Sequence, residues 1–249
     1  MLRLHYFGIV KMKNIFAYAL CNLLAVFSLN ASAQEESNVA TQLELGAIFT
    51  SGNTENENIK YKITVDWNQA EVWDYQFTSD GFRSSQDGIS NAQRLYHTGS
   101  ANYTINPDSY IQGRIAYEND KFSGFESQSD ITVSYGRNML QNRGNMTLGL
   151  TAGLGVRRSE TELNTESVAI ARLATNYNWT LSESADFIQD FSIETGSDSS
   201  IYRSETGVQT DILENLSLKF SVKLKYQTVV PINRKKADTE TAITLVLNF

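Results

Sequence analysis

Hydrophobic and polar residues alternate along most of this chain, and the last thirteen residues show the pattern most clearly. One face of segment 237–249 carries Thr239, Thr241, Ile243, Leu245, Leu247 and Phe249, and the other carries Glu240, Ala242, Thr244 and Asn248, with the apolar Val246 as the exception. Because side chains alternate faces along a β-strand, this segment predicts a strand with one apolar face. An apolar edge strand promotes aggregation, and closure of a barrel against the first strand would remove that edge.

Similar strand-like runs fill the rest of the chain. We predict twelve, at about 40–50, 58–67, 72–82, 92–105, 110–120, 128–139, 145–157, 167–179, 185–196, 201–212, 216–228 and 238–249. Their apolar faces are five or six side chains long, which matches the apolar band of about 25 Å on a transmembrane barrel. The prediction is a single all-β domain over 40–249, folded as an antiparallel transmembrane β-barrel. A soluble β-sandwich or barrel would share the same period and is the alternative.

The connections between these runs alternate in length. The short ones are 68–71, 106–109, 140–144, 180–184 and 213–215, and the longer ones are 51–57, 83–91, 121–127, 158–166, 197–200 and 229–237. Outer-membrane barrels have short periplasmic turns and longer extracellular loops, so the alternation favours this class. All three tryptophans, Trp67, Trp73 and Trp179, lie next to short turns, where they predict an aromatic girdle on the periplasmic side.

The first 33 residues have the features of a secretory signal peptide. Arg3, Lys11 and Lys13 supply positive charge, an apolar run covers 15–29, and small residues at 31–33 form a cleavage pattern. The prediction is export and removal of residues 1–33, followed by a short polar lead-in at 34–39. Translation from Met1 or from Met12 would both leave positive charge before the apolar run.

Composition narrows the function further. Removing the three basic residues of the signal leaves 18 basic and 28 acidic residues, a formal charge of −10, which argues against nucleic-acid binding. The single cysteine, Cys21, lies inside the signal, so the exported chain would depend on neither disulfides nor thiols. Both prolines, Pro107 and Pro231, fall in predicted connections, as expected of a chain that is mostly strand.

Four short motifs resemble a known family. They are Thr-Ser-Gly-Asn-Thr-Glu at 50–55, Tyr-Glu-Asn-Asp-Lys-Phe-Ser-Gly-Phe at 117–125, Tyr-Arg-Ser-Glu-Thr at 202–206 and Arg-Lys-Lys-Ala-Asp-Thr at 234–239. This set resembles the YdiY-like family of putative salt-induced outer membrane proteins, a domain of unknown function, over about residues 43–249. The resemblance implies an outer-membrane barrel and no catalytic residues. The terminal Phe249 also resembles the insertion signal that the barrel-assembly machinery recognises.

The search for catalytic or metal chemistry yields little. A lipid-modifying enzyme in the outer membrane would need a Ser–His pair on the lipid side. His97 and Ser79 have the right parity, but a hairpin centred at 86–87 predicts that His97 lies nearer Gln76. Acidic groups near the loops, Glu118, Asp120 and Glu126 or Glu194 with Asp198, lack the spacing of a calcium loop. We therefore expect no catalytic residue, no metal site and no cofactor.

Charged residues on the inward faces are more informative. The candidates to line the lumen are Lys60, Lys62, Arg94, Arg114, Glu118, Arg172, Glu194, Arg203, Glu205, Lys219, Lys223, Lys225 and Glu240. Charge facing lipid is costly, so these side chains are expected to point inward. They would either tune a narrow aqueous path or pair with one another and block it. The stripe of Lys219, Lys223 and Lys225 favours anions, unless Glu205, Asp211 and Glu240 on the flanking strands neutralise it.

The sequence thus predicts an outer-membrane barrel that is either structural or a narrow channel for small solutes. The family label implies a link to salt stress. The expected partners of the barrel are outer-membrane lipid, lipopolysaccharide, the barrel-assembly machinery and small solutes, but no nucleic acid. The alternatives are an outer-membrane lipid-modifying enzyme and a soluble periplasmic binding protein.

Overall fold

The computed structural model of the protein describes residues 38–50, 56–69, 72–87, 89–120, 123, 125–140, 143–232 and 234–249. They belong to one compact unit, Asn38–Phe249. The predicted signal peptide at 1–33 and residues 34–37 of the lead-in lie outside the described residues, so both stay predictions. Within the described ranges, no helix is long and apolar enough to cross a membrane.

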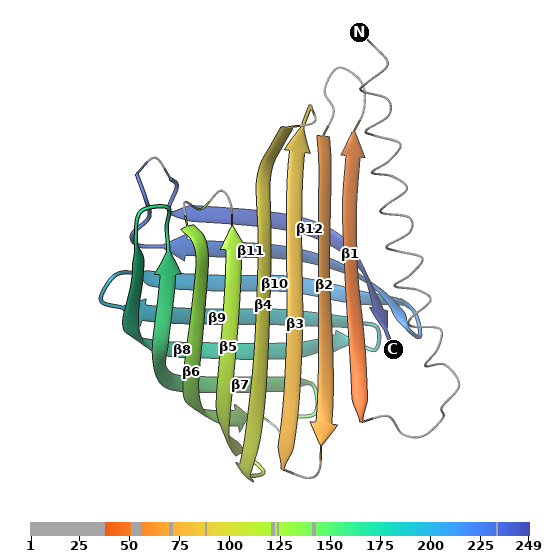
Figure 1. The fold of residues 1–249 in the computed structure, drawn as a ribbon. Coiled ribbons are helices and arrows are strands. Elements are labelled where there is room, and N and C mark those ends of the chain that lie inside the picture. The colour runs from red at the N-terminus through yellow and green to blue at the C-terminus, as the bar shows by residue number, and fades with distance from the viewer. Residues whose placement is uncertain are drawn as a thin grey trace. The chain divides into compact units, whose positions relative to one another are not determined.

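Twelve antiparallel strands form a closed barrel. They are β1 (Val39–Thr50), β2 (Asn56–Gln69), β3 (Trp73–Gln86), β4 (Ile89–Asn106), β5 (Ser109–Asp120), β6 (Phe125–Met139), β7 (Met146–Glu160), β8 (Thr165–Ser182), β9 (Ala185–Gly196), β10 (Ser200–Leu213), β11 (Leu216–Gln227) and β12 (Ala237–Asn248). Each strand pairs with its neighbours in the chain, and β12 pairs with β1. Figure 1 shows β1 to β5 in the near wall, with β8 to β12 crossing behind them. The predicted barrel architecture is confirmed.

The barrel is apolar outside and polar inside, because alternate side chains point to opposite sides of each strand. On the outer surface, Leu154 is 72% exposed and Ile131 is 63% exposed. On the inner surface, Glu44 and Thr132 are each 1% exposed. This arrangement is the reverse of a soluble protein and matches a barrel surrounded by lipid. The alternative explanation of the alternation, a soluble β-sandwich or barrel, therefore fits the structure less well than a transmembrane barrel.

Two glycines allow β6 and β7 to approach closely. A Cβ atom on Gly153 would overlap the carbonyl oxygen of Val133, and one on Gly155 would overlap that of Ile131. Any larger residue would have to displace the backbone of β6. Glycine inside a strand often marks such a close approach or a bend at a barrel corner.

The connection between β3 and β4 corrects the sequence prediction. A loop over 83–91 was expected, but only Asp87 and Gly88 separate the two strands. Asp87 has a φ of 51°, which suits the first central residue of a two-residue hairpin turn. Asp-Gly is the usual sequence for this turn, so the signal was present in the chain. The longest connection is 228–236, between β11 and β12.

Aromatic residues cluster outside the barrel near the short turns. Trp67 is 46% exposed and lies 5.6 Å from Tyr75, measured between ring centroids. Trp73 lies 5.1 Å from Tyr103 on β4, and Trp179 on β8 is also exposed. Tryptophan and tyrosine favour the boundary between lipid and water. The rings therefore form a cluster on the outside of the barrel, and its place at the periplasmic boundary stays a prediction.

The seam between the first and last strands closes the barrel. Gln42–Leu45 of β1 pair with Leu245–Asn248 of β12. Beyond β12, Phe249 and Thr41 exchange two backbone hydrogen bonds, of 2.9 and 3.1 Å. This seam is shorter than the β1–β2 pairing, which covers the whole of β1 from Val39 to Thr50. Loss of Phe249 would therefore remove two backbone hydrogen bonds from a seam that is already short.

We predict that Phe249→Asp lowers the yield of folded barrel. The substitution places a charge next to the short seam and alters the residue that resembles an insertion signal. The measurement is the folded fraction in membranes by heat-modifiable electrophoresis. As a control, Ile232→Asp changes an equally apolar residue that is 91% exposed in the 228–236 connection, and should be harmless. Equal folded fractions for the two variants would contradict this role of Phe249.

We also predict that Ile115→Arg on β5 disrupts folding more than Gln112→Arg on the same strand. Ile115 is 58% exposed on the outer surface, whereas Gln112 lines the interior. Arginine in the middle of a lipid-facing surface costs about 2–4 kcal/mol. The check is folded yield in lipid vesicles, and a greater defect for Gln112→Arg would show that the two faces are reversed.

Candidate functional site

A cavity of about 500 Å³ occupies the barrel interior. Its lining comes from β2 to β5 and from β7 to β12. Ten of the thirteen candidate residues are in that lining: Lys62, Arg94, Arg114, Glu118, Arg172, Arg203, Glu205, Lys223, Lys225 and Glu240. The other three, Lys60, Glu194 and Lys219, are buried and form ion pairs with interior residues. Whether the cavity is part of a continuous path for solutes stays a prediction.

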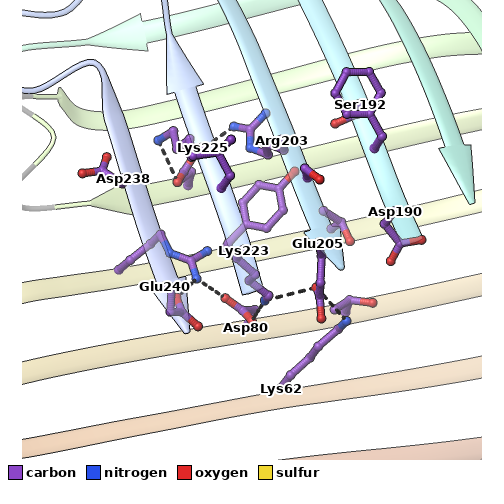
Figure 2. A pocket seen from close by; sticks show the side chains of 18 of the residues that line it. Lys62, Asp80, Asp190, Ser192, Arg203, Glu205, Lys223, Lys225, Asp238 and Glu240 are labelled. Atoms are coloured by element: carbon purple, nitrogen blue, oxygen red, sulfur yellow. Dashed lines mark hydrogen bonds and ion pairs between the residues drawn. The ribbon is translucent and has the colours of Figure 1, made fainter. Parts of the chain in front are cut away.

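Ion pairs divide the interior charges into two clusters. The first, here called cluster A, joins Lys60, Lys62, Arg94, Lys219 and Lys223 to Glu44, Asp80, Glu205 and Glu240. Asp80 on β3 accepts a hydrogen bond from Lys223 at 2.5 Å and forms an ion pair with Arg94 at 2.6 Å. Figure 2 shows Lys223 between Asp80 and Glu205, with Lys62 on the other side of Glu205. Cluster A connects β1, β2, β3 and β4 to β10, β11 and β12.

The second group, cluster B, joins Arg114, Arg172, Arg203 and Lys225 to Glu118, Asp130 and Glu194. Glu118 accepts from Arg203 at 2.8 Å and from Lys225 at 2.9 Å. Arg203 lies on β10 and Lys225 on β11, whereas Glu118 lies on β5. Since β5 and β11 are six strands apart in a ring of twelve, the contact between Lys225 and Glu118 crosses the barrel. Arg203 also lies over the ring of Tyr96, 5.2 Å from its centroid.

Electrostatics explains why these charges are paired. Removing an ion from water is costly, and a buried pair offsets the loss only with short contacts and further hydrogen bonds. Each cluster nevertheless contains one more cation than anions. One cation in each cluster has only long ion-pair contacts: Lys62 at 3.6 and 3.9 Å, and Arg172 at 3.5 Å.

The lysine stripe is neutralised, but of the three partners expected from sequence only Glu205 takes part. The acceptors are Glu44 and Glu205 for Lys219, Asp80 and Glu205 for Lys223, and Glu118 for Lys225. Asp211 instead accepts a hydrogen bond from Ser217, and Glu240 pairs with Lys60 and Arg94. Three acceptors therefore lie on β1, β3 and β5, away from the flanking strands. Only the adjacent partner, Glu205, could be found by comparing neighbouring strands in the sequence.

Sequence reasoning also missed three charged residues of the interior. Glu44 and Asp80 belong to cluster A, and strand parity would have placed both on the inward faces. Arg157 on β7 is 1% exposed, and its Nη2 donates to Asp198 and to the carbonyl oxygen of Ser199, each at 2.7 Å. Arg157 thus holds the β9–β10 connection. Asp198 and Glu194, considered for a cation, both accept from arginine in the structure.

The expected separation of Ser79 and His97 is wrong. The two residues are direct Cα partners between β3 and β4. Gln86 pairs with Ile89, so the hairpin is centred at 87–88 and not at 86–87, which moves the partner of His97 from Gln76 to Thr78. A register shift between Ser84 and Ser85 moves it one position further, to Ser79. Among the described residues, no hydrogen bond joins the side chains of Ser79 and His97. Ser79 Oγ lies 3.5 Å from the hydroxyl of Tyr61, and the imidazole of His97 stacks on Tyr117 at 6.4 Å. A Ser–His mechanism requires the imidazole to take the serine proton directly, and this geometry does not provide that contact.

A closed twelve-stranded barrel with an apolar exterior and a charged interior places the protein in the fold class of outer-membrane β-barrels. Two solved structures share this fold: the NanC porin, with 6% identity and a TM-score of 0.51, and the COG4313 outer membrane channel from Pseudomonas putida F1, with 9% identity and a TM-score of 0.50. The alignments cover 84% and 88% of this chain, and 97% and 98% of the respective structures. At these identities the likeness concerns the fold alone.

The chain belongs to the family described as "Protein of unknown function, DUF481", whose model matches residues 43–249. A relative from Escherichia coli (strain K12), the uncharacterized protein YdiY, is 22% identical over 209 residues, which cover 83% of this chain and 81% of the relative. The resemblance to the YdiY-like family is therefore confirmed. The relative is uncharacterized and the solved neighbours are a porin and a channel, so the comparisons assign no reaction.

Cluster B makes a prediction about stability. Glu194 is 1% exposed and is approached by Arg203, Arg172 and Arg114. Removing one partner of a buried ion pair costs about 3–5 kcal/mol, because the other charge remains buried. We therefore expect Glu194→Gln to lower the free energy of unfolding by a similar amount. Urea unfolding in lipid vesicles, followed by tryptophan fluorescence, would measure the change.

The matched control for this experiment is Glu183→Gln, at an exposed residue between β8 and β9. It removes the same charge from a solvated position and should leave the unfolding curve unchanged. Identical curves for both variants would mean that the ion pairs of cluster B do not stabilise the barrel.

Proposed function

We propose that this protein resides in the outer membrane and provides a narrow path for small hydrophilic solutes. The observation that carries the proposal is the cavity of about 500 Å³, lined by charged and polar side chains inside a barrel with an apolar exterior. A polar lumen can replace part of the hydration of a solute, and its charges can determine which solutes pass. The function needs no catalytic residue and no cofactor.

Several features support the membrane location. The exposed apolar side chains are suited to contact with lipid, and the aromatic residues outside the barrel are suited to a membrane boundary. The signal-like sequence at 1–33 would direct export, and Phe249 would mark the chain for the barrel-assembly machinery. Outer-membrane lipid and lipopolysaccharide would then surround the barrel, and small solutes would be its transient ligands.

The ion pairs of clusters A and B limit the width of the proposed path. Twelve strands lie between eight, where side chains fill the interior, and sixteen, where a channel is open. The pairs of Glu118 with Lys225 and Arg203 narrow the lumen further because they cross it. A permeating solute would pass beside these groups or replace part of their interactions.

The same ion pairs favour one competing function. If they close the lumen completely, the barrel is an envelope-structural protein that does not transport. The lipid-modifying enzyme is a weaker candidate, because it depends on Ser79 and His97 alone. Conductance separates the first two functions, and turnover of phospholipid by the purified protein would support the third.

We predict a small single-channel conductance for the wild type in planar bilayers and a larger one for Glu118→Gln. The substitution removes the carboxylate that holds Lys225 and Arg203 across the barrel, so the lumen should widen and favour anions more strongly. The control is Glu183→Gln, which removes a charge outside the cavity and should conduct like the wild type. A folded wild type and a folded Glu118→Gln variant that both pass no current would contradict the proposed path and favour the structural barrel.

A further inference from the structure

Arg172 on β8 is the cation of cluster B whose nearest ion-pair contact is long. Its Nε lies 3.5 Å from Glu194 without forming a hydrogen bond, and its Nη1 donates to Thr151 Oγ1 at 3.4 Å. Glu194 is already bound by Arg203 at 2.8 Å, and Arg114 approaches it to 3.7 Å. Three guanidinium groups therefore share one carboxylate, and Arg172 has no short contact with it.

Small side chains border Arg172 inside the barrel. Thr151, Ala174 and Ser192 are successive Cα partners across β7, β8 and β9, and all three line the cavity. Arg203 is the Cα partner of Ser192 on β10, and Figure 2 shows these two residues on neighbouring strands. We call Thr151, Ala174 and Ser192 the shelf. The shelf borders the cavity, as do Arg172 and Arg203, and carries two hydroxyl groups.

The other carboxylates in the cavity lining have cationic or amide neighbours. Asp190 on β9 accepts a hydrogen bond from Asn176 at 2.8 Å. Asp190 is also the Cα partner of Glu205, an anion of cluster A that contacts Lys62 at 3.6 Å. The charge of Asp190 therefore lies towards cluster A. The lining also contains Asp120 and Asp238, which are the Cα partners of Arg94 and Lys225. The shelf itself contributes no negative charge.

We propose that Arg172 and the shelf bind the carboxylate of a small organic acid. A guanidinium group can form two parallel hydrogen bonds with a carboxylate, which would give Arg172 the short partner that Glu194 does not provide. The hydroxyl groups of Thr151 and Ser192 can donate to the same carboxylate. The inference rests on the proposed function, since a path through the barrel would bring the solute to the shelf.

The test is calorimetric titration of the full chain, folded in detergent at low ionic strength, with glutarate as the probe and the neutral glutaramide as its comparison. The wild type should bind glutarate and not glutaramide. Arg172→Gln should weaken glutarate binding about tenfold or more, since one strong charged hydrogen bond is worth that much. Arg158→Gln makes the same substitution at an exposed residue of β7 and should leave binding unchanged.

A second variant keeps the test decisive if Arg172→Gln does not fold. Ala174→Leu fills the shelf without altering any charge and should also weaken glutarate binding. Absence of binding by the folded wild type, or equal binding by the wild type and the folded shelf variants, would overturn the proposal. Current without glutarate binding would reject the site but retain the path, whereas binding without current would retain the site and reject the path.

Discussion

The structure depends on one constraint: a barrel in lipid must direct its charges inward and then pair them. The apolar outer surface excludes charge, and the interior is too narrow to hydrate many charges fully. Clusters A and B meet both conditions. Pairing across the barrel, as between Glu118 on β5 and Lys225 on β11, also links distant strands through side chains. The same contacts therefore serve stability and limit the width of the lumen.

This constraint couples the proposed transport to the fold. Substitutions that open the lumen remove buried ion pairs, so some stability should be lost wherever conductance is gained. Arg172 is a partial exception, because its contacts with Glu194 and Thr151 are long. A residue with weak partners inside a polar cavity is well suited to exchange them for a ligand. Cluster B and the candidate binding site at Arg172 are therefore parts of one network.

Much of the fold could be predicted from residues that are near one another in the chain. Strand alternation predicts the twelve strands, the inward direction of Lys223 and the outward direction of Ile243. Asp-Gly at 87–88 is the usual sequence of a tight hairpin turn, although a longer loop is predicted there. A hairpin centred on this turn would place His97 opposite Thr78, and the shift between Ser84 and Ser85, which has no clear sequence signal, moves it opposite Ser79. The alignment of two strands depends on every such irregularity between them.

The partners of the interior charges were less predictable for a different reason. Adjacent strands can be compared by parity, and this finds Glu205 beside Lys219. Contacts across the lumen depend on barrel diameter, strand tilt and stagger, which no local pattern contains. The pairing of Lys223 with Asp80, and of Lys225 with Glu118, therefore required the three-dimensional structure. The long contacts of Arg172, on which the binding proposal depends, became visible only with those distances.

The central claim is that the inward faces border a hydrated interior whereas the outward faces contact lipid. The most direct measurement is the reactivity of single cysteines on β5 with a charged, membrane-impermeant thiol reagent, after reconstitution into vesicles. Cys21, the only natural cysteine, lies within the predicted signal, so the background should be low. The account predicts that cysteine at Gln112 reacts and that cysteine at Ile115 does not. Reaction at Ile115 with protection at Gln112 would contradict it.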